Sequence, residues 1–269
     1  MKTILIIGST GYIGKILKKN LSKDYSLICP SRKKGFDISN FKKLNKNLNK
    51  NIDIIINLSG QISTKTNLSK IILRGNQNII KAIKNKKKPI VYYISTTLVY
   101  GYSSKLLNEK SATKPISDYA KIKLKGERIF NLSNINYKIL RLANVYCNQK
   151  NNFIKNMIDS IKNPKKIFVN NVNSYRNYIH IDDVVKIITK IIKTDLKFTV
   201  YNIGHENISI KTMINTIEKK FKNKIHYIDN KVEKKIDSSQ RLKKCKIFNE
   251  IKLYPKLNFN KFLDNCLKI

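Results

Sequence analysis

A glycine-rich turn directly after the first apolar run restricts the fold of this chain more than any other feature. Gly8, Gly11 and Gly14 follow the run Thr3–Ile7 and open an amphipathic stretch. In a turn of this kind one glycine permits the tight bend, one lets backbone N–H groups approach a pyrophosphate, and one lets helix and strand pack closely. The helix also directs the positive end of its dipole at the anion. The spacing therefore predicts a dinucleotide-binding strand–turn–helix unit.

Short apolar runs alternate with longer amphipathic stretches over the first half of the chain. The predicted strands are Thr3–Ile7, Tyr25–Cys29, Asp53–Asn57, Ile90–Ser95 and Tyr137–Leu142. The predicted helices are Tyr12–Leu21, Phe41–Leu48, Leu68–Lys86 and Tyr119–Phe130. This alternation predicts an α/β fold with a Rossmann-type doubly wound parallel sheet. The pattern loosens later, so we expect a dinucleotide-binding lobe over 1–145 and a smaller C-terminal substrate lobe over 146–269, with a shared core.

The chain is strongly basic, with 55 Lys and Arg against 17 Asp and Glu and a formal net charge of +38. Only six of these 55 basic residues are arginine. Proteins that recognise nucleic acids rely on arginine for bidentate contacts, so the shortage of arginine argues against that role. The lysines are spread along the whole chain with abundant Asn and Ile. We therefore interpret the charge as biased residue usage and expect no specific nucleic-acid partner, although it would attract anionic substrates.

The cysteines and the apolar runs indicate the cellular location of the protein. Cys29, Cys147, Cys245 and Cys266 form no CxxC pair and no plausible His/Cys ligand set, so we expect no metal site and a cytoplasmic location. No apolar run approaches the roughly 18 residues of a membrane span. We expect a homodimer without a membrane segment.

The end of the second predicted strand indicates which cofactor is used. An acidic residue there would accept a hydrogen bond from the ribose 2′-hydroxyl of NAD. The sequence instead runs Cys29-Pro30-Ser31-Arg32-Lys33-Lys34, with no acid. Ser31 and Arg32 can hold a 2′-phosphate, so the sequence predicts NAD(P) binding and favours NADP. The alternative is that Arg32 is one more basic surface residue.

Tyr119 and Lys123 lie four residues apart and would share one helix face. The spacing alone is weak, because 14 tyrosines and many lysines produce such pairs by chance. Its context is stronger, because a predicted strand ends at Ser95-Thr96 and carboxyl ends of parallel strands line the ligand crevice. We predict that Tyr119 exchanges a proton with substrate, that Thr96 shares the same substrate oxygen, and that Lys123 holds the ribose and favours the phenolate. The alternatives are a half-buried helix tyrosine and a hydroxyl that caps the strand end.

Eight segments, in order, resemble the extended short-chain dehydrogenases (NAD-dependent epimerases and dehydratases). They are Gly8–Gly14, Asp37-Ile38, Asn57–Gly60, Ile94–Gly101, Pro115–Glu127, Arg141–Tyr146, Arg176–Val184 and Tyr201–Gly204. The resemblance implies cofactor contacts from Gly8, Thr10, Gly11, Tyr12, Ile13, Gly14, Asp37, Ile38, Leu58, Ser59, Gly60, Tyr119 and Lys123. It implies substrate contacts from Thr97, Asn144 and Arg176, with Arg176 on the phosphates of a sugar nucleotide.

Departures from the family pattern narrow the expected reaction. Sugar-nucleotide dehydratases carry Asp-Glu after the catalytic Thr, where this chain has Thr97 and Leu98, so dehydration is disfavoured. UDP-hexose epimerases carry a late Arg, where this chain has Lys231, Lys234 and Lys235. We expect a 4-keto reductase or 4-epimerase of a nucleotide-diphosphate sugar, in the biosynthesis of surface polysaccharide sugars. The alternatives are an NADP-dependent reductase of a small carbonyl substrate and a non-catalytic NAD(P)-sensing protein.

Overall fold

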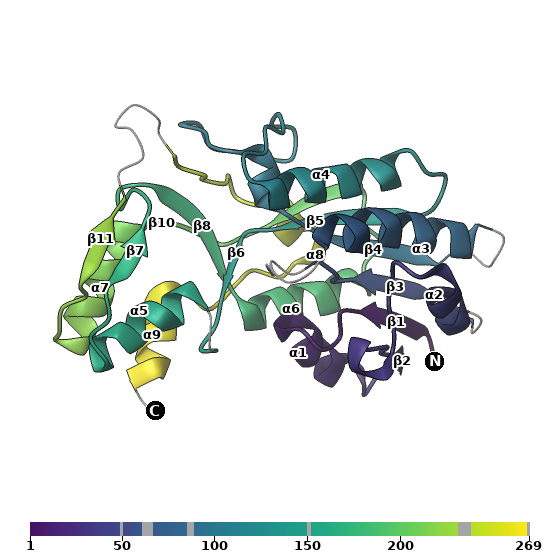
Figure 1. The fold of residues 1–269 in the computed structure, drawn as a ribbon, viewed down its shortest axis with the longest axis horizontal. Coiled ribbons are helices and arrows are strands. Elements are labelled where there is room, and N and C mark those ends of the chain that lie inside the picture. The colour runs from purple at the N-terminus through teal and green to yellow at the C-terminus, as the bar shows by residue number, and fades with distance from the viewer. Residues whose placement is uncertain (49–50, 61–66, 85–88, 150–151, 231–237, 268–269) are drawn as a thin grey trace. The chain divides into compact units, whose positions relative to one another are not determined.

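The computed structural model describes residues 1–48, 51–60, 67–84, 89–149, 152–230 and 238–267 (Figure 1). These residues form two compact units. Unit 1 comprises Met1–Val99, Pro115–Leu142 and Val185–Asn202. Unit 2 comprises Tyr100–Lys114, Ala143–Val184 and Ile203–Ile269. The sequence predicts a single boundary near residue 145, whereas both units are discontinuous, because a late strand returns to the first sheet.

Unit 1 is built on a six-stranded sheet with the order β2-β1-β3-β4-β5-β9. The strands are β1 (Thr3–Ile7), β2 (Ser26–Ile28), β3 (Ile54–Asn57), β4 (Ile90–Thr96), β5 (Tyr137–Leu142) and β9 (Val200–Ile203). The pairs from β2 through β5 are all parallel. The inner strands are nearly continuous runs of Ile, Val, Leu and Tyr, as expected when both faces of a parallel sheet are covered. The predicted doubly wound α/β fold is confirmed.

Helices cover the sheet of unit 1. They are α1 (Tyr12–Leu21), α2 (Phe41–Leu48), α3 (Gly75–Ile83), α4 (Asp118–Asn131) and α6 (Ile181–Ile191), with short turns η1 (Arg32–Lys34), η2 (Lys70–Arg74) and η3 (Thr97–Tyr100). Apolar residues of α2, α3 and α4 share one buried cluster with residues of β1, β3, β4 and β5. Figure 1 shows α1 and α6 on the opposite face. The helix predicted over Leu68–Lys86 is divided: η2 is a single π-helical turn, and the α-helix begins at Gly75.

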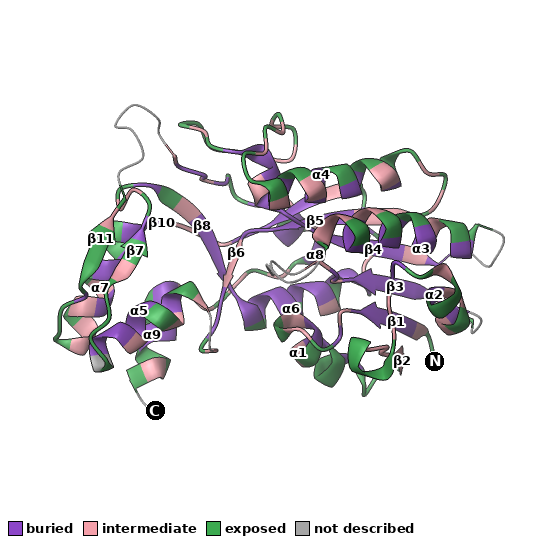
Figure 2. Ribbon diagram, viewed as in Figure 1, coloured by how far each residue is buried: buried purple, intermediate pink, exposed green. Residues whose placement is uncertain are grey.

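The described residues of unit 2 form two small sheets and four helices. β8 (Tyr175–His180) pairs antiparallel with β10 (Glu206–Ser209) and parallel with β6 (Asn144–Tyr146), while β7 (Ile167–Val169) pairs parallel with β11 (Tyr227–Asp229). The helices are α5 (Phe153–Lys162), α7 (Ile210–Phe221), α8 (Ile247–Ile251) and α9 (Phe259–Leu267). Figure 2 shows buried residues on the inner sides of α5, α7 and α9, and these helices contribute to one apolar cluster. Among the described residues, none of the helices combines the length and apolar character needed to span a bilayer.

Candidate active site

The glycine turn after β1 has the geometry that the sequence predicts. Gly8 has a φ of +86°, a left-handed conformation that side chains disfavour. A Cβ atom on Gly14 would lie 2.3 Å from the carbonyl oxygen of Gly8, so another residue there would push α1 away from the turn. Gly11 caps the N-terminus of α1, and no acidic side chain lies in the first turn of this helix. The positive end of the helix dipole therefore faces the turn without a competing carboxylate.

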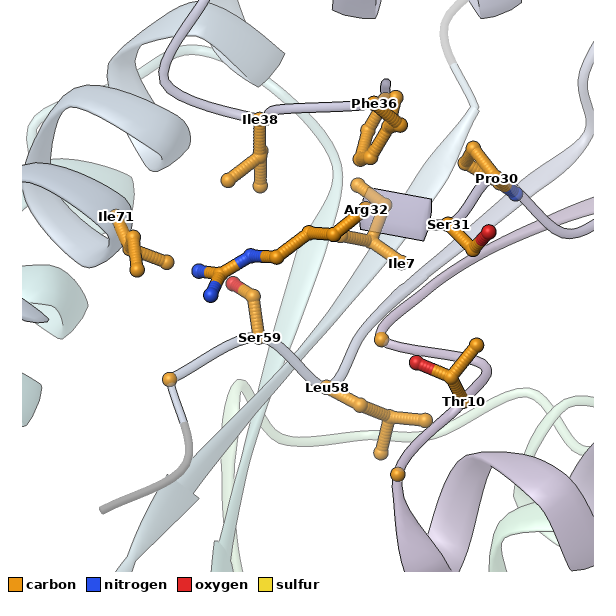
Figure 3. Close-up of a pocket in the computed structure, with 13 residues that line it drawn as sticks. Ile7, Thr10, Pro30, Ser31, Arg32, Phe36, Ile38, Leu58, Ser59 and Ile71 are labelled. Atoms are coloured by element: carbon orange, nitrogen blue, oxygen red, sulfur yellow. The ribbon is translucent and has the colours of Figure 1, made fainter. Parts of the chain in front are cut away.

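A pocket of about 300 Å³ in unit 1 adjoins this turn (Figure 3). Nine of the predicted cofactor residues line it: Gly8, Thr10, Gly11, Ser31, Arg32, Ile38, Leu58, Ser59 and Gly60. Four apolar residues that the sequence analysis did not single out also line it: Ile7, Pro30, Phe36 and Ile71. The pocket combines apolar walls with the backbone of a glycine turn. This combination suits a nucleotide whose base is apolar and whose phosphates are charged.

Six other predicted cofactor residues do not line this pocket: Tyr12, Ile13, Gly14, Asp37, Tyr119 and Lys123. The first three belong to the first turn of α1. The carboxylate of Asp37 instead accepts hydrogen bonds from the backbone N–H and hydroxyl of Ser39, both at 2.8 Å. Burial opposes the charge of Asp37, but these hydrogen bonds and the positive charges of Lys70 and Arg32 together outweigh it and lower the pKa of Asp37. Asp37 therefore stabilises the turn beside Ile38, which does line the pocket.

Arg32 enters the pocket from the turn after β2. Figure 3 shows its guanidinium directed toward the side where Ser59 and Ile71 lie. Ser31 and Arg32 begin η1, which ends at Gly35 with a φ of +76°. The structure thus places both residues that the sequence assigned to a 2′-phosphate at the pocket wall.

Tyr119 and Lys123 lie in the first two turns of α4, which Ser117 caps by accepting a hydrogen bond from the N–H of Ala120 at 3.3 Å. Lys123 is 3% exposed, and its Nζ donates to the carbonyl oxygens of Ser59 at 3.0 Å and Ile94 at 2.8 Å. The same Nζ lies 6.0 Å from the ring centroid of Tyr119. Lys123 therefore connects the pocket wall at Ser59 with the strand that ends at Thr96.

Burial sets the protonation of this pair. It raises the pKa of Tyr119 to about 12 and lowers the pKa of Lys123 to about 7, against a smaller opposing effect of Glu127. The sequence predicts that Lys123 favours the phenolate of Tyr119. In the structure, desolvation acts in the other direction, because a low-dielectric environment disfavours both charged forms. Tyr119 therefore holds its proton at neutral pH in this structure.

Thr96 ends β4 and is nearly buried, with 8% exposure. Its Oγ1 accepts a hydrogen bond from the backbone N–H of Leu98 at 3.2 Å. The capping interaction that the sequence analysis named as an alternative is thus present. It uses Oγ1 as an acceptor and leaves the hydroxyl proton for donation.

The predicted substrate residues lie in two different units. Thr97 is in unit 1, is 1% exposed and begins η3. Asn144 and Arg176 are in unit 2, where Asn144 Nδ2 donates to the carbonyl oxygen of Asn177 at 3.0 Å. Arg176 donates to the carbonyl oxygens of Tyr175 and Ser238, and its guanidinium lies 5.1 Å from the ring centroid of Tyr102.

Arg241, which the sequence analysis did not single out, also lies in unit 2. It donates to the carbonyl oxygen of Ser104, and its guanidinium lies 5.6 Å from the ring centroid of Tyr175. The residue before it, Gln240, forms an isolated parallel β-bridge with Arg176. Lys231, Lys234 and Lys235, which occupy the expected place of a late arginine, lie outside the described residues. Within the described ranges, His, Cys, Asp and Glu side chains form no cluster of three that would suit a metal.

The fold and pocket define a dinucleotide-binding α/β protein with a Rossmann-type sheet. The family described as the NAD dependent epimerase/dehydratase family matches residues 4–204, and the chain belongs to this family. It is therefore an enzyme, and the resemblance noted in the sequence is confirmed.

Individual relatives and solved structures agree with this membership. The chain is 27% identical to an uncharacterized protein, MJ1055, of Methanocaldococcus jannaschii, over 87% of this chain and 83% of that protein. It is 28% identical to dTDP-4-dehydrorhamnose reductase of Salmonella typhimurium, over 62% of this chain and 60% of that protein.

Three solved structures share the fold. dTDP-glucose 4,6-dehydratase of Bacillus anthracis with NAD has a TM-score of 0.85 at 17% identity, covering 100% of this chain and 96% of that one. UDP-glucuronic acid 4-epimerase of Bacillus cereus with UDP-glucuronic acid and NAD has a TM-score of 0.83 at 22% identity, with 97% and 96% covered. RMD of Pseudomonas aeruginosa with NADPH has a TM-score of 0.83 at 17% identity, with 100% and 98% covered.

Proposed function

We propose that this enzyme is an NAD(P)-dependent oxidoreductase that acts on a nucleotide-diphosphate sugar, as a 4-keto reductase or a 4-epimerase. One observation carries the proposal. The buried ammonium of Lys123 donates both to Ser59, at the wall of the glycine-turn pocket, and to Ile94, two residues before Thr96. A single side chain thus joins the cofactor pocket to the strand end that carries the proposed catalytic hydroxyl.

The pocket residues fit a bound nicotinamide dinucleotide. The left-handed Gly8 and the start of α1, where no side chain caps the helix, leave backbone N–H groups for the pyrophosphate, and Ile38, Phe36 and Leu58 supply apolar walls. In the described part of the chain two carbonyl oxygens accept from Lys123 Nζ, so its third N–H can donate to a ribose hydroxyl. When bound, the cofactor supplies or accepts the hydride.

The residues of this chain handle the proton. Tyr119, protonated at neutral pH because of its burial, can donate to a carbonyl oxygen as that carbon is reduced. In the reverse direction it must receive the proton of a hydroxyl, which the charge of Lys123 favours by stabilising the phenolate. Thr96 donates to the same oxygen and holds it in place.

We propose NADP as the preferred cofactor. Ser31 and Arg32 line the pocket at the end of β2, and no acidic residue stands between Ile28 and Phe36. A carboxylate there would repel a 2′-phosphate, whereas a guanidinium binds it bidentately. NAD and NADPH are both found in the solved structures that share this fold.

The nucleotide-sugar assignment rests on unit 2 and on the relatives. Arg176 presents a planar guanidinium suited to a diphosphate, and the matched enzymes include a dTDP-sugar reductase and a UDP-sugar epimerase. Thr97 and Leu98 occupy the places where a dehydratase would need an acid and a base, so we propose reduction or epimerisation in place of water elimination. Such a product fits the biosynthesis of surface polysaccharide sugars.

Thermal unfolding with ligands tests the function. NADPH by itself should raise the melting temperature, and a UDP- or dTDP-hexose added to it should raise the melting temperature further. Each ligand binds the folded chain and not the unfolded chain, so each stabilises the fold. Oxidation of NADPH should then be followed with a 4-keto sugar nucleotide, and interconversion of epimers with a 4-hydroxy one. If no sugar nucleotide shifts the melting temperature but a small carbonyl is reduced, the enzyme is a small-carbonyl reductase. Binding of NADPH without any turnover would indicate a sensing protein.

A further inference from the structure

A buried carboxylate lies directly behind the proposed catalytic pair. Glu127 is 1% exposed and sits on α4, one helical turn after Lys123. Arg141 on β5 donates from Nε to Oε1 at 3.0 Å and from Nη2 to Oε2 at 2.6 Å, and Ser95 Oγ donates to Oε1 at 2.5 Å. These three residues, the Ser95–Glu127–Arg141 cluster, hold both oxygens of the carboxylate in fixed positions.

The cluster lies where the elements of the site meet. Ser95 immediately precedes Thr96 at the end of β4, and it lies opposite Arg141 in the β4–β5 register. Glu127 shares its helix face with Lys123 and Tyr119, because the three residues are spaced by four. The cluster therefore fixes α4 against the two strands beside Thr96, while Lys123 makes the parallel contact with Ile94.

The cluster also contains an anion, Glu127, whose charge acts on the Lys123 ammonium. Burial lowers the pKa of Lys123, and the charge of Glu127 opposes this effect. Among the described residues, two tyrosines also face Lys123: Tyr119 on α4 and Tyr93 on β4, whose ring centroid lies 5.0 Å from Nζ. Both are neutral near pH 7, because burial raises their pKa values. Arg141 is positive and limits the support that Glu127 can give.

We propose that the Ser95–Glu127–Arg141 cluster is a positioning device for the catalytic pair, in which Glu127 favours the charged form of Lys123 and holds Tyr119 in register with Thr96. The proposal rests on the proposed function of Tyr119 and Lys123. Glu127 acts through Lys123 and is a positioning residue, since its carboxylate oxygens are occupied by Arg141 and Ser95. A purely structural anchor would have the same contacts but would not control the charge of Lys123.

The ionisation of Lys123 can be followed in the protein without any ligand. Lysine labelled with ¹³C at Cε reports deprotonation by NMR, and exposed lysines titrate near pH 10.4. A titration midpoint near neutral pH is therefore distinct from those of the exposed lysines. If this midpoint disappears in Lys123→Met, it belongs to Lys123. We expect Glu127→Gln to lower this midpoint by about one pH unit or more, because the buried ammonium loses its anion.

Shifts of the Lys123 midpoint in opposite directions distinguish an effect of charge from a general disruption of packing. Arg141→Met should raise the midpoint, because it removes the cation that now neutralises Glu127. Disruption of packing would instead move both variants in the same direction. Breaking one side of a buried ion pair is destabilising, so the double variant Glu127→Gln/Arg141→Met removes both charges. The midpoint of that double variant should lie between the midpoints of the two single variants, because the two charges act on Lys123 in opposite directions.

A matched control and two clear outcomes complete the test. Glu206→Gln replaces a partly buried carboxylate in unit 2, where it accepts from the N–H of Phe259, and it should leave the midpoint unchanged. The proposal is overturned if Glu127→Gln leaves the Lys123 midpoint in place, or if Arg141→Met lowers the midpoint as Glu127→Gln does. These measurements need no substrate, so a failed activity assay would contradict the proposed function and leave the titration result standing.

Discussion

Replacing Lys123 with methionine should remove a large part of the pH dependence of stability between pH 7 and pH 9. The reason is the burial of its ammonium, which lowers the pKa of Lys123 from the ordinary 10.5 to about 7. Below pH 7 the folded and unfolded states both carry the proton. Between pH 7 and 10.5 the unfolded chain carries one proton that the folded chain lacks. The free energy of unfolding therefore rises with pH across this interval.

The magnitude follows from the same values. One extra proton in the unfolded state changes stability by about 1.4 kcal/mol for each pH unit. Between pH 7 and pH 9 the parent should thus gain on the order of 2–3 kcal/mol relative to Lys123→Met. The variant also leaves the carbonyl oxygens of Ser59 and Ile94 without this donor. That loss is independent of pH. The change of the unfolding free energy with pH therefore reports on the Lys123 charge, whereas a constant difference between the two proteins does not.

Urea unfolding at pH 6, 7, 8 and 9 measures this slope. Salt at about 1 M screens exposed charges to a Debye length of about 3 Å, which suppresses the contribution of the lysine-rich surface. Lys125→Met is the matched control, because Lys125 is exposed on the same helix and should behave as the parent does. If the free energy of unfolding changes with pH equally in the parent and in Lys123→Met, the reasoning is refuted, since Lys123 would then titrate alike in the folded and unfolded states.

Three further predictions concern the site. Tyr119→Phe should lower turnover by about two or more orders of magnitude while NADPH still raises the melting temperature; near-normal turnover would remove Tyr119 from the mechanism. Arg32→Ala should narrow the preference for NADPH over NADH in a fluorescence titration, with Lys33→Ala as the neighbouring control; equal affinities in the parent would contradict an NADP preference. Arg176→Lys should weaken sugar-nucleotide binding about tenfold or more in calorimetry at high salt, because lysine keeps the charge but loses the planar fork. Unchanged affinity there would leave the lysine-rich surface as the source of attraction, and a small-carbonyl reductase would become the better interpretation.

Local spacing explains why much of the site could be predicted. The glycine turn needs Gly8 for its left-handed backbone and Gly14 for close packing, and both requirements act within a few residues of chain. The interval between Tyr119 and Lys123 places them on one helix face wherever the helix lies. For the same reason β1, α1, α2 and β5 have the bounds that periodicity predicted. In unit 2, the strands β6, β10 and β11 contain three or four residues each, too few for periodicity to show.

The sequence by itself determined the α/β class, the position of the glycine turn and the placement of Tyr119 and Lys123 on one helix face, because these depend on neighbouring residues. The tertiary structure decided what surrounds them. Ser95 and Arg141 reach Glu127 from 32 and 14 residues away in the chain, and the β4–β5 register brings them together. Burial, which no spacing in the sequence expresses, then moves the pKa of Lys123 toward neutrality and that of Tyr119 away from it. Desolvation depends on every atom packed around a group, so the protonation of this pair is a property of the folded chain.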